Sequence, residues 1–178
     1  MGQRITLENL EILFVEDDEL VAESVVEFLR GCGATVYYAQ NAVQAFEALR
    51  RHTGIRLMVT DIRMPIIDGK QLVKEAMQFW PKLHVIFTTG FADLSGIPQS
   101  TPVLDKPYAF EELERTILQF CPPAWLVQKQ AGPVAGKAHE AQFDQAWEAV
   151  ASSLDGSVSQ TTPKLLEGQV PSPAPIEE

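Results

Sequence analysis

Short apolar runs alternate with amphipathic segments between residues 10 and 121. The apolar runs have the length of β-strands and cover residues 11–15, 35–39, 55–60, 83–88 and 103–104. The segments with hydrophobic residues at helical spacing cover residues 19–30, 41–51, 70–80 and 110–120. Because strands that alternate with helices form parallel sheets with helices on both faces, this pattern predicts an α/β fold built on a doubly wound, five-stranded parallel sheet.

The hydrophobic spacing also predicts which helix faces are buried. The helix of residues 19–30 has one apolar stripe, made of Leu20, Val21, Val25, Phe28 and Leu29. The corresponding positions of the other two clear helices are Val43, Phe46 and Leu49, then Leu113, Ile117 and Leu118. Asn41 is a plausible N-cap for the second helix, since its side chain can accept a hydrogen bond from a free backbone N–H.

One helix of the alternating pattern is missing between residues 88 and 103. Gly96, Pro98 and Pro102 interrupt this segment and leave too few uninterrupted residues for a regular helix. We therefore expect a loop or a single turn over residues 91–101. The fourth helix of the fold is predicted to be shortened or replaced by this loop.

The composition changes after residue 121, where 7 of the 12 prolines lie in residues 122–178. We expect a first domain of residues 1–123 and a Pro-rich tail of residues 124–178. One amphipathic helix is predicted in the tail, around residues 138–155, from the apolar positions Phe143, Ala146, Trp147, Val150 and Leu154. Periodicity is lost after Ser157, so the end of the chain is expected to be disordered.

Carboxylates follow two of the predicted strands. Glu16 and Asp17 come directly after the first strand, and Asp61 comes directly after the third. Parallel strands of such a sheet end at one edge, where open α/β folds place their ligands. Hard oxygen ligands suit Mg²⁺, and adjacent anions repel one another until a cation neutralises them. The pattern therefore indicates a divalent-cation site.

A lysine and a hydroxyl complete the set of polar groups at this edge. Lys106 follows the last strand, and Thr88 or Thr89 ends the fourth. An Asp can act as a nucleophile toward phosphorus, while a cation, an ammonium group and a hydroxyl bind the phosphoryl oxygens. Phosphoryl transfer depends chiefly on positioning and electrostatic stabilisation, so these groups suffice for it.

Residues 10–121 resemble the receiver domain of two-component response regulators, the CheY-like superfamily with a flavodoxin-like sheet. The acidic pair Glu16-Asp17 after the first strand, the run Asp-x-x-Met-Pro-x-x-Asp-Gly at residues 61–69 and the element Lys106-Pro107 carry this resemblance. It implies phosphorylation of Asp61 and a cis peptide bond before Pro107. It also implies Mg²⁺ bound directly by Asp17, Asp61 and the backbone carbonyl of Arg63, with Glu16 acting mainly through water.

Two further positions are interpreted through the same resemblance. The family has a small residue after its switch hydroxyl, so Thr89 before Gly90 fits better than Thr88. The segment from Phe87 to Phe91 is similar to a receiver subgroup in which the fourth helix becomes a loop. The position three residues before Lys106 is usually aromatic in receivers and is Val103 here, so the usual coupling between the hydroxyl and an aromatic ring is not expected.

Length and charge narrow the functional class. The 178 residues suffice for one domain with an appendage, and the net charge of −10 argues against direct nucleic acid binding. No apolar run is long enough to span a bilayer, and the N-terminal residues lack the apolar stretch of a secretory signal, so we expect a cytoplasmic protein without membrane insertion. Cys32 and Cys121 are expected to be reduced thiols.

These observations predict a response regulator without a recognisable output domain. It would accept a phosphoryl group on Asp61 from a sensor histidine kinase or a phosphotransfer protein, and signal through protein contacts. It is not expected to be a conventional enzyme, beyond self-catalysed phosphorylation and dephosphorylation. The tail helix either packs on the receiver, or covers the surface left by the shortened helix and is displaced or forms a homodimer contact on phosphorylation.

Two other functions are alternatives to this prediction. A phosphohydrolase of the haloacid-dehalogenase type also uses an Asp nucleophile with Mg²⁺, but requires a second Asp two positions later, where this chain has Arg63. A pseudo-receiver that only binds proteins would not need the phosphorylation residues, all of which are present. Both alternatives are therefore disfavoured.

Overall fold

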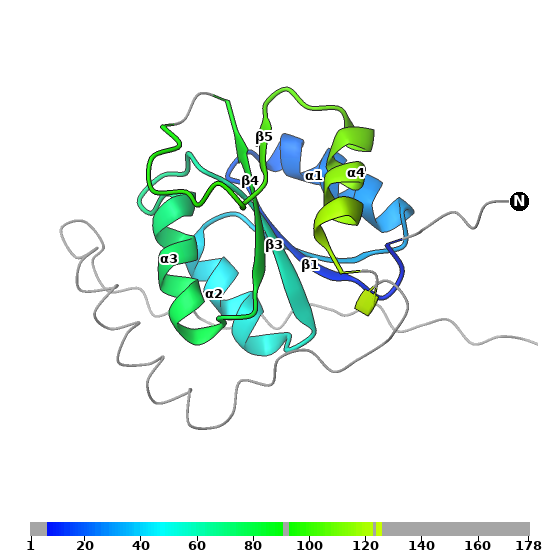
Figure 1. The fold of residues 1–178 in the computed structure, drawn as a ribbon, viewed down its shortest axis with the longest axis horizontal. Helices are drawn as coiled ribbons and strands as arrows, with labels where there is room; N and C mark the ends of the chain where they lie inside the picture. The colour runs from blue at the N-terminus through cyan, green and yellow to red at the C-terminus, as the bar shows by residue number, and fades with distance from the viewer. Residues whose placement is uncertain (1–6, 91–92, 123, 126–178) are drawn as a thin grey trace, which may run out of the picture.

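A five-stranded parallel sheet forms the centre of the molecule (Figure 1). The computed structural model describes residues 7–90, 93–122 and 124–125. The strands are β1 (Glu11–Val15), β2 (Thr35–Ala39), β3 (Ile55–Asp61), β4 (His84–Thr89) and β5 (Val103–Asp105). Their order in the sheet is β2-β1-β3-β4-β5, and every neighbouring pair is parallel. The predicted doubly wound α/β fold is confirmed.

Within the described residues, four helices cover the sheet, two on each face (Figure 1). They are α1 (Glu19–Gly31), α2 (Ala42–Arg51), α3 (Gly69–Phe79) and α4 (Phe110–Phe120). Side chains at the N-caps Asp18, Asn41 and Asp68 accept backbone hydrogen bonds from the first turns of α1, α2 and α3, as such residues do at free helix N-termini. The helix bounds predicted from the sequence agree with these bounds within one residue at each end.

The segment between β4 and β5 contains no helix in its described part, residues 93–102. This confirms that the expected fourth helix is replaced by a loop. Two of its residues, 91 and 92, lie outside the described chain, as do the predicted helix around residues 138–155 and nearly all of the Pro-rich tail. None of the helices in the described residues is both long enough and apolar enough to span a lipid bilayer.

The core is divided by the sheet into two layers. Successive residues of a strand point to opposite faces, so Leu13 and Met58 pack under α2 and α3, whereas Phe14 and Val59 pack under α1 and α4. Side chains on both faces of the central strands are almost fully buried. This explains why the strands read as continuous apolar runs rather than as alternating ones.

The predicted stripe of α1 is partly wrong. Leu20 is 77% exposed and Val21 is 37% exposed, while the buried residues are Ala22, Val25, Val26 and Leu29. At about 100° per residue, Leu20 lies on the side of the helix opposite to that stripe. The small residue Ala22 occupies the core position instead. A prediction based on large apolar residues does not identify it, because alanine is only weakly hydrophobic.

The same correction applies to α2. Val43 is 45% exposed, and the buried stripe runs through Ala42, Ala45, Phe46 and Leu49. The predictions for Phe46 and Leu49, and for Leu113 and Ile117 of α4, are confirmed. Both errors have one cause, since an alanine at the helix–sheet contact allows close packing while a larger neighbour stays in solvent.

Candidate functional site

The polar residues singled out in the sequence stand at the carboxyl ends of the parallel strands, which lie at one edge of the sheet. Asp61 is the last residue of β3 and is paired in register with Thr88 of β4. Glu16 follows β1, and its backbone N–H donates to the carbonyl of Ala39 at the end of β2. Lys106 follows β5, and its N–H donates to the carbonyl of Thr89 over 2.6 Å. The fold therefore holds these residues by their backbones.

Three carboxylates meet at this edge. One oxygen each of Glu16, Asp17 and Asp61 lies within 4.8 Å of the others. Glu16 and Asp61 are almost fully buried, and Asp17 is half-buried. Anions this close repel one another unless a cation lies between them, and an all-oxygen set of this kind fits Mg²⁺. The chemistry of the donor set therefore agrees with the predicted metal.

The ammonium group of Lys106 joins two of these carboxylates. Its Nζ donates to Oε2 of Glu16 and to Oδ2 of Asp61, each over 2.5 Å. Burial disfavours the ammonium ion, but the hydrogen bonds to Asp61 and Glu16 outweigh it and raise the pKa of Lys106. Burial also raises the pKa of Glu16, against the opposing effect of Lys106. Lys106 thus stays charged beside the acidic cluster.

The loop after β3 fixes the orientation of Asp61. The backbone N–H of Arg63 donates to Oδ1 of Asp61 over 2.9 Å, so both carboxylate oxygens are held, one by this N–H and one by Lys106. The loop closes where the N–H of Gly69 donates to the carbonyl of Ile62 over 2.9 Å. A Cβ on Gly69 would lie 2.1 Å from the carbonyl oxygen of Asp61, so only glycine fits there.

Hydroxyl groups surround the strand ends. Thr88 and Thr89 are both buried, and the Thr88 hydroxyl has no hydrogen-bond partner among the described residues. The hydroxyl of Thr60 donates to the carbonyl of Asp61 over 3.0 Å. The role of Thr89 as the switch hydroxyl stays a prediction.

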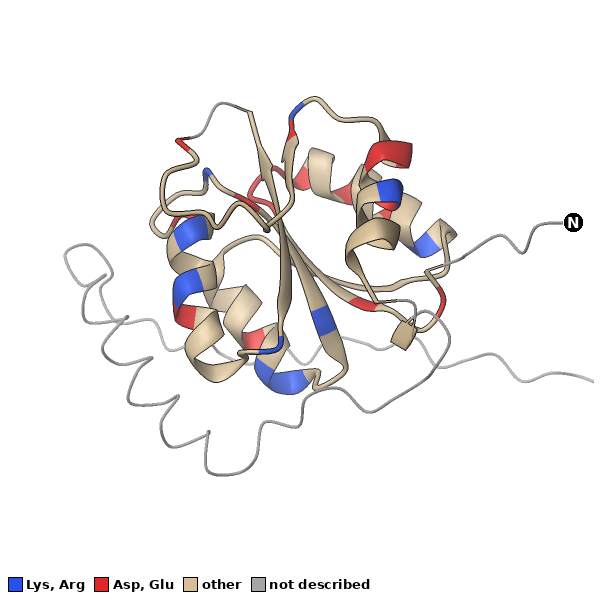
Figure 2. Cartoon of the chain, viewed as in Figure 1, with Lys and Arg blue, Asp and Glu red and all other residues tan. Residues whose placement is uncertain are grey.

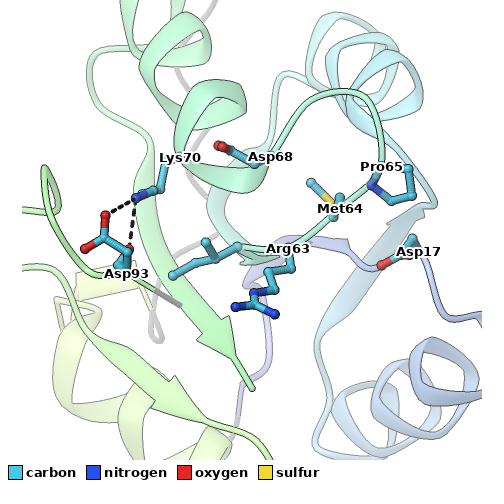
Figure 3. Close-up of a pocket in the computed structure, with 8 residues that line it drawn as sticks. Asp17, Arg63, Met64, Pro65, Asp68, Lys70 and Asp93 are labelled. Atoms are coloured by element: carbon cyan, nitrogen blue, oxygen red, sulfur yellow. Dashed lines mark hydrogen bonds and ion pairs between the residues drawn. The ribbon is translucent and has the colours of Figure 1, made fainter. Parts of the chain in front are cut away.

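An open hollow lies beside the acidic cluster, and Figure 3 shows its lining. Asp17 lies on one side, Arg63 in the middle, and Lys70 and Asp93 on the other. No sequence signal marks Lys70, because a lysine after Asp-Gly looks like an ordinary solvent-exposed residue of a first helical turn. It also missed Tyr38, whose hydroxyl donates to the carbonyl of Glu16 over 2.9 Å.

The structure brings the adjacent residues Glu16 and Asp17 together with Asp61 and Lys106, which come from two distant parts of the sequence. The Lys106–Pro107 peptide bond is cis, as the resemblance to receivers implied. Val103, at the position that is usually aromatic in receivers, is a partly buried residue packed against the core under α2 and α3.

Comparisons with known proteins agree with this geometry. Residues 12–117 match the family model described as the response regulator receiver domain. The response regulator receiver protein CpdR of Brucella abortus (strain 2308) is 34% identical over 111 residues, which cover 60% of this chain and 92% of CpdR. The sensor kinase CckA of the same organism is 30% identical over 113 residues, which cover 60% of this chain and 12% of the kinase.

A solved structure gives the same result. The crystal structure of the receiver domain from the hybrid histidine kinase CckA is 31% identical, with a TM-score of 0.54, and the match covers 62% of this chain and 99% of that domain. The family model alone spans more than half of the 178 residues. This chain therefore belongs to the response regulator receiver domain family.

Proposed function

We propose that this receiver accepts a phosphoryl group on Asp61 in the presence of Mg²⁺, and that it transmits the signal through contacts with other proteins. The observation that carries this proposal is the ammonium of Lys106, bound at 2.5 Å to both Asp61 and Glu16 beside a third carboxylate. A nucleophile, a fixed cation and an oxygen-ligand cluster are the groups that phosphoryl transfer requires.

The chemistry assigns a role to each side chain. A carboxylate oxygen of Asp61 attacks phosphorus, while the bond from phosphorus to the imidazole nitrogen of the donor breaks and leaves its electron pair on that nitrogen. Lys106 offsets negative charge on the phosphoryl oxygens, and the hydroxyl of Thr89 binds one of them. Glu16, Asp17, Asp61 and the carbonyl of Arg63 would hold Mg²⁺, which supplies further neutralisation of phosphoryl charge when bound.

The expected donor is the phosphohistidine of a sensor kinase or of a phosphotransfer protein. Support comes from the similarity to CpdR, named a response regulator receiver protein, and to the receiver domain of the kinase CckA. We place the protein in the cytoplasm, where such kinases present their histidines, and assign it no direct contact with nucleic acid. It acts as a transducer, and its own catalysis is limited to forming and slowly hydrolysing one acyl phosphate.

The test is phosphorylation by acetyl phosphate. The wild-type protein is expected to form an acid-labile acyl phosphate in Mg²⁺ and none in EDTA, read by phosphate-affinity electrophoresis and intact mass. Asp61→Asn removes the nucleophile and should abolish the product. Asp105→Asn is the matched control, because Asp105 is an exposed carboxylate at the end of β5 with no assigned role.

Two results would replace the proposal. A wild-type protein that forms no acyl phosphate with any donor would be a pseudo-receiver that only binds partners. Multiple-turnover hydrolysis of small phosphate esters, lost in Asp61→Asn, would instead show a phosphohydrolase. The second result is not expected, since Arg63 occupies the position where such an enzyme needs an acid, and its N–H is bound to Asp61.

A further inference from the structure

Lys70 connects the loop that replaces the fourth helix to the start of α3. Its ammonium donates to the backbone carbonyl of Asp93 over 2.9 Å and to that of Ser95 over 3.3 Å. The carboxylate of Asp93 is a further partner, 3.7 Å away (Figure 3). A single side chain of α3 therefore holds this loop by its backbone.

The held segment is a short, locally folded turn. The N–H of Ser95 donates to the carboxylate of Asp93 over 2.9 Å, and its hydroxyl binds the same carboxylate. The N–H of Ile97 donates to the carbonyl of Leu94 over 3.2 Å, and Ile97 packs against the core while Leu94 is 47% exposed. Loss of the Lys70 contacts would free two carbonyls and leave this turn attached to the domain mainly through Ile97.

The other end of the connection reaches the phosphoacceptor. Lys70 directly follows Gly69, where an added Cβ would lie 2.1 Å from the carbonyl oxygen of Asp61, and whose N–H donates to the carbonyl of Ile62. Displacement of the Asp61 backbone would therefore move the base of the Lys70 side chain. Lys70 also lines the same hollow as Asp17, a member of the acidic cluster around Asp61. Lys70 therefore shares the hollow with one carboxylate of that cluster.

We propose that Lys70 is a charge-sensitive strap, which holds residues 93–97 in the unphosphorylated protein and is drawn toward the hollow when Asp61 carries a phosphoryl group. This inference rests on the proposed function. The present partners of Lys70 are two neutral carbonyls and one exposed carboxylate. Ammonium groups bind phosphoryl oxygens more strongly than neutral carbonyls, so added negative charge in the hollow weakens the strap.

The strap gives this receiver a way to change shape that does not use an aromatic residue in β5, where it has Val103. The contact is partly exposed, with the Lys70 side chain 28% accessible, so solvent screens it and its contribution to stability is small. A weak contact is what a reversible switch requires, because a ligand moves an equilibrium only by its difference in affinity for the two states.

The experiment records backbone amide NMR spectra of the full chain before and after Mg²⁺ and beryllofluoride, a phosphoryl mimic. Lys70→Met removes the ammonium and keeps the apolar stem. Lys74→Met is the matched control, because Lys74 is an exposed lysine one turn later on α3 and makes no hydrogen bond or ion pair with residues 93–97. Lys70→Arg retains the charge and should behave like the wild type.

In the wild type, the amides of Ser95 and Ile97 should shift on addition of beryllofluoride, and those of Arg63 and Lys106 should report occupancy of the site. In Lys70→Met, the amide signals of Ser95 and Ile97 should lie near their shifted positions before beryllofluoride is added, and should change little when it is added. An equal response in wild type and Lys70→Met, or none at Ser95 and Ile97 while Arg63 and Lys106 shift, overturns the strap alone. If the amides of Arg63 and Lys106 do not shift in the wild type, the proposed function is wrong, and the strap with it.

Discussion

At the residue scale, Asp17 is the carboxylate of the acidic cluster to which Lys106 does not bind. It is half-buried beside Glu16 and Asp61, whereas Lys106 binds those two. Asp17→Asn removes one repelling charge and should raise the free energy of unfolding in EDTA by about 1 kcal/mol. It should also remove most of the stabilisation that Mg²⁺ gives the wild type, since a bound ion stabilises only the folded state.

Urea denaturation in EDTA and in Mg²⁺ checks this prediction. Asp105→Asn, an exposed carboxylate outside the cluster, should change neither curve. Full Mg²⁺ stabilisation of Asp17→Asn would mean that Asp17 is not a ligand of the ion.

Tyr108 presents a second residue-scale prediction. Its hydroxyl is buried and has no hydrogen-bond partner among the described residues. A buried polar group without a partner is unfavourable, so Tyr108→Phe should raise the free energy of unfolding by about 1 kcal/mol. Tyr38→Phe is the matched control and should lower it by a similar amount, because the Tyr38 hydroxyl donates to the carbonyl of Glu16 over 2.9 Å.

The pH dependence of Tyr108→Phe gives an independent check. Burial raises the pKa of Tyr108 from 10.0 to about 12, so the neutral phenol is favoured in the folded state. A raised pKa contributes stability that is complete below the unfolded value and is lost as pH rises through the folded one. Wild-type stability should therefore fall more steeply than that of Tyr108→Phe between about pH 10 and 12. Parallel curves would show that the phenol is hydrated in the native state.

At the scale of elements, the contact between β3 and α3 depends on Gly69. An added Cβ would lie 2.1 Å from the carbonyl oxygen of Asp61, and backbone atoms cannot move aside as a flexible side chain can. Gly69→Ala should therefore displace the start of α3 or the end of β3, lower the free energy of unfolding by about 1–3 kcal/mol and slow phosphorylation by acetyl phosphate.

Gly31→Ala supplies the matched comparison within the same fold. Gly31 is the last residue of α1, and a Cβ there meets nothing within 4 Å. This change should be neutral or stabilise by up to about 1 kcal/mol, because alanine favours the helix over the unfolded chain. Equal effects of the two substitutions would show that the close approach at Gly69 carries no constraint.

At the scale of the whole molecule, the described core extends to Trp125, which packs against it. The centroid of the Trp125 ring lies 4.4 Å from the centroid of the His84 ring. The guanidinium carbon of Arg56 lies 5.6 Å from the centroid of the Trp125 ring. A chain ending at residue 125 keeps this core and should therefore fold and accept a phosphoryl group on Asp61 from acetyl phosphate. A further Trp125→Ala change should lower stability by about 1 kcal/mol through loss of the ring and cation contacts.

The truncated chain also tests the two roles considered for the tail. If residues 126–178 pack on the receiver, their removal should lower the urea midpoint. If they form a contact between copies, light scattering should show a change in oligomeric state on phosphorylation that the truncated chain has lost. An unchanged midpoint, with the same oligomeric state before and after phosphorylation, would exclude both roles.

The sequence by itself determined the order of strands and helices, the ends of the elements and the grouping of polar residues at one sheet edge. These follow from local rules, since apolar periodicity, capping side chains and turn residues act within a few positions of one another. The residues after parallel strands meet at one edge whatever the details of packing, so Glu16, Asp61 and Lys106 could be placed together in advance.

Only the tertiary structure decided which atoms touch. The two bonds of Lys106 join residues 90 and 45 positions apart, and the Lys70 strap spans 23 positions. Such contacts depend on how elements pack and on side-chain rotamers, which no local pattern encodes. The burial of alanines in α1 and α2, with Leu20 and Val43 exposed, has the same explanation. Whether a side chain is buried depends on the surface that packs against it as well as on the residue itself.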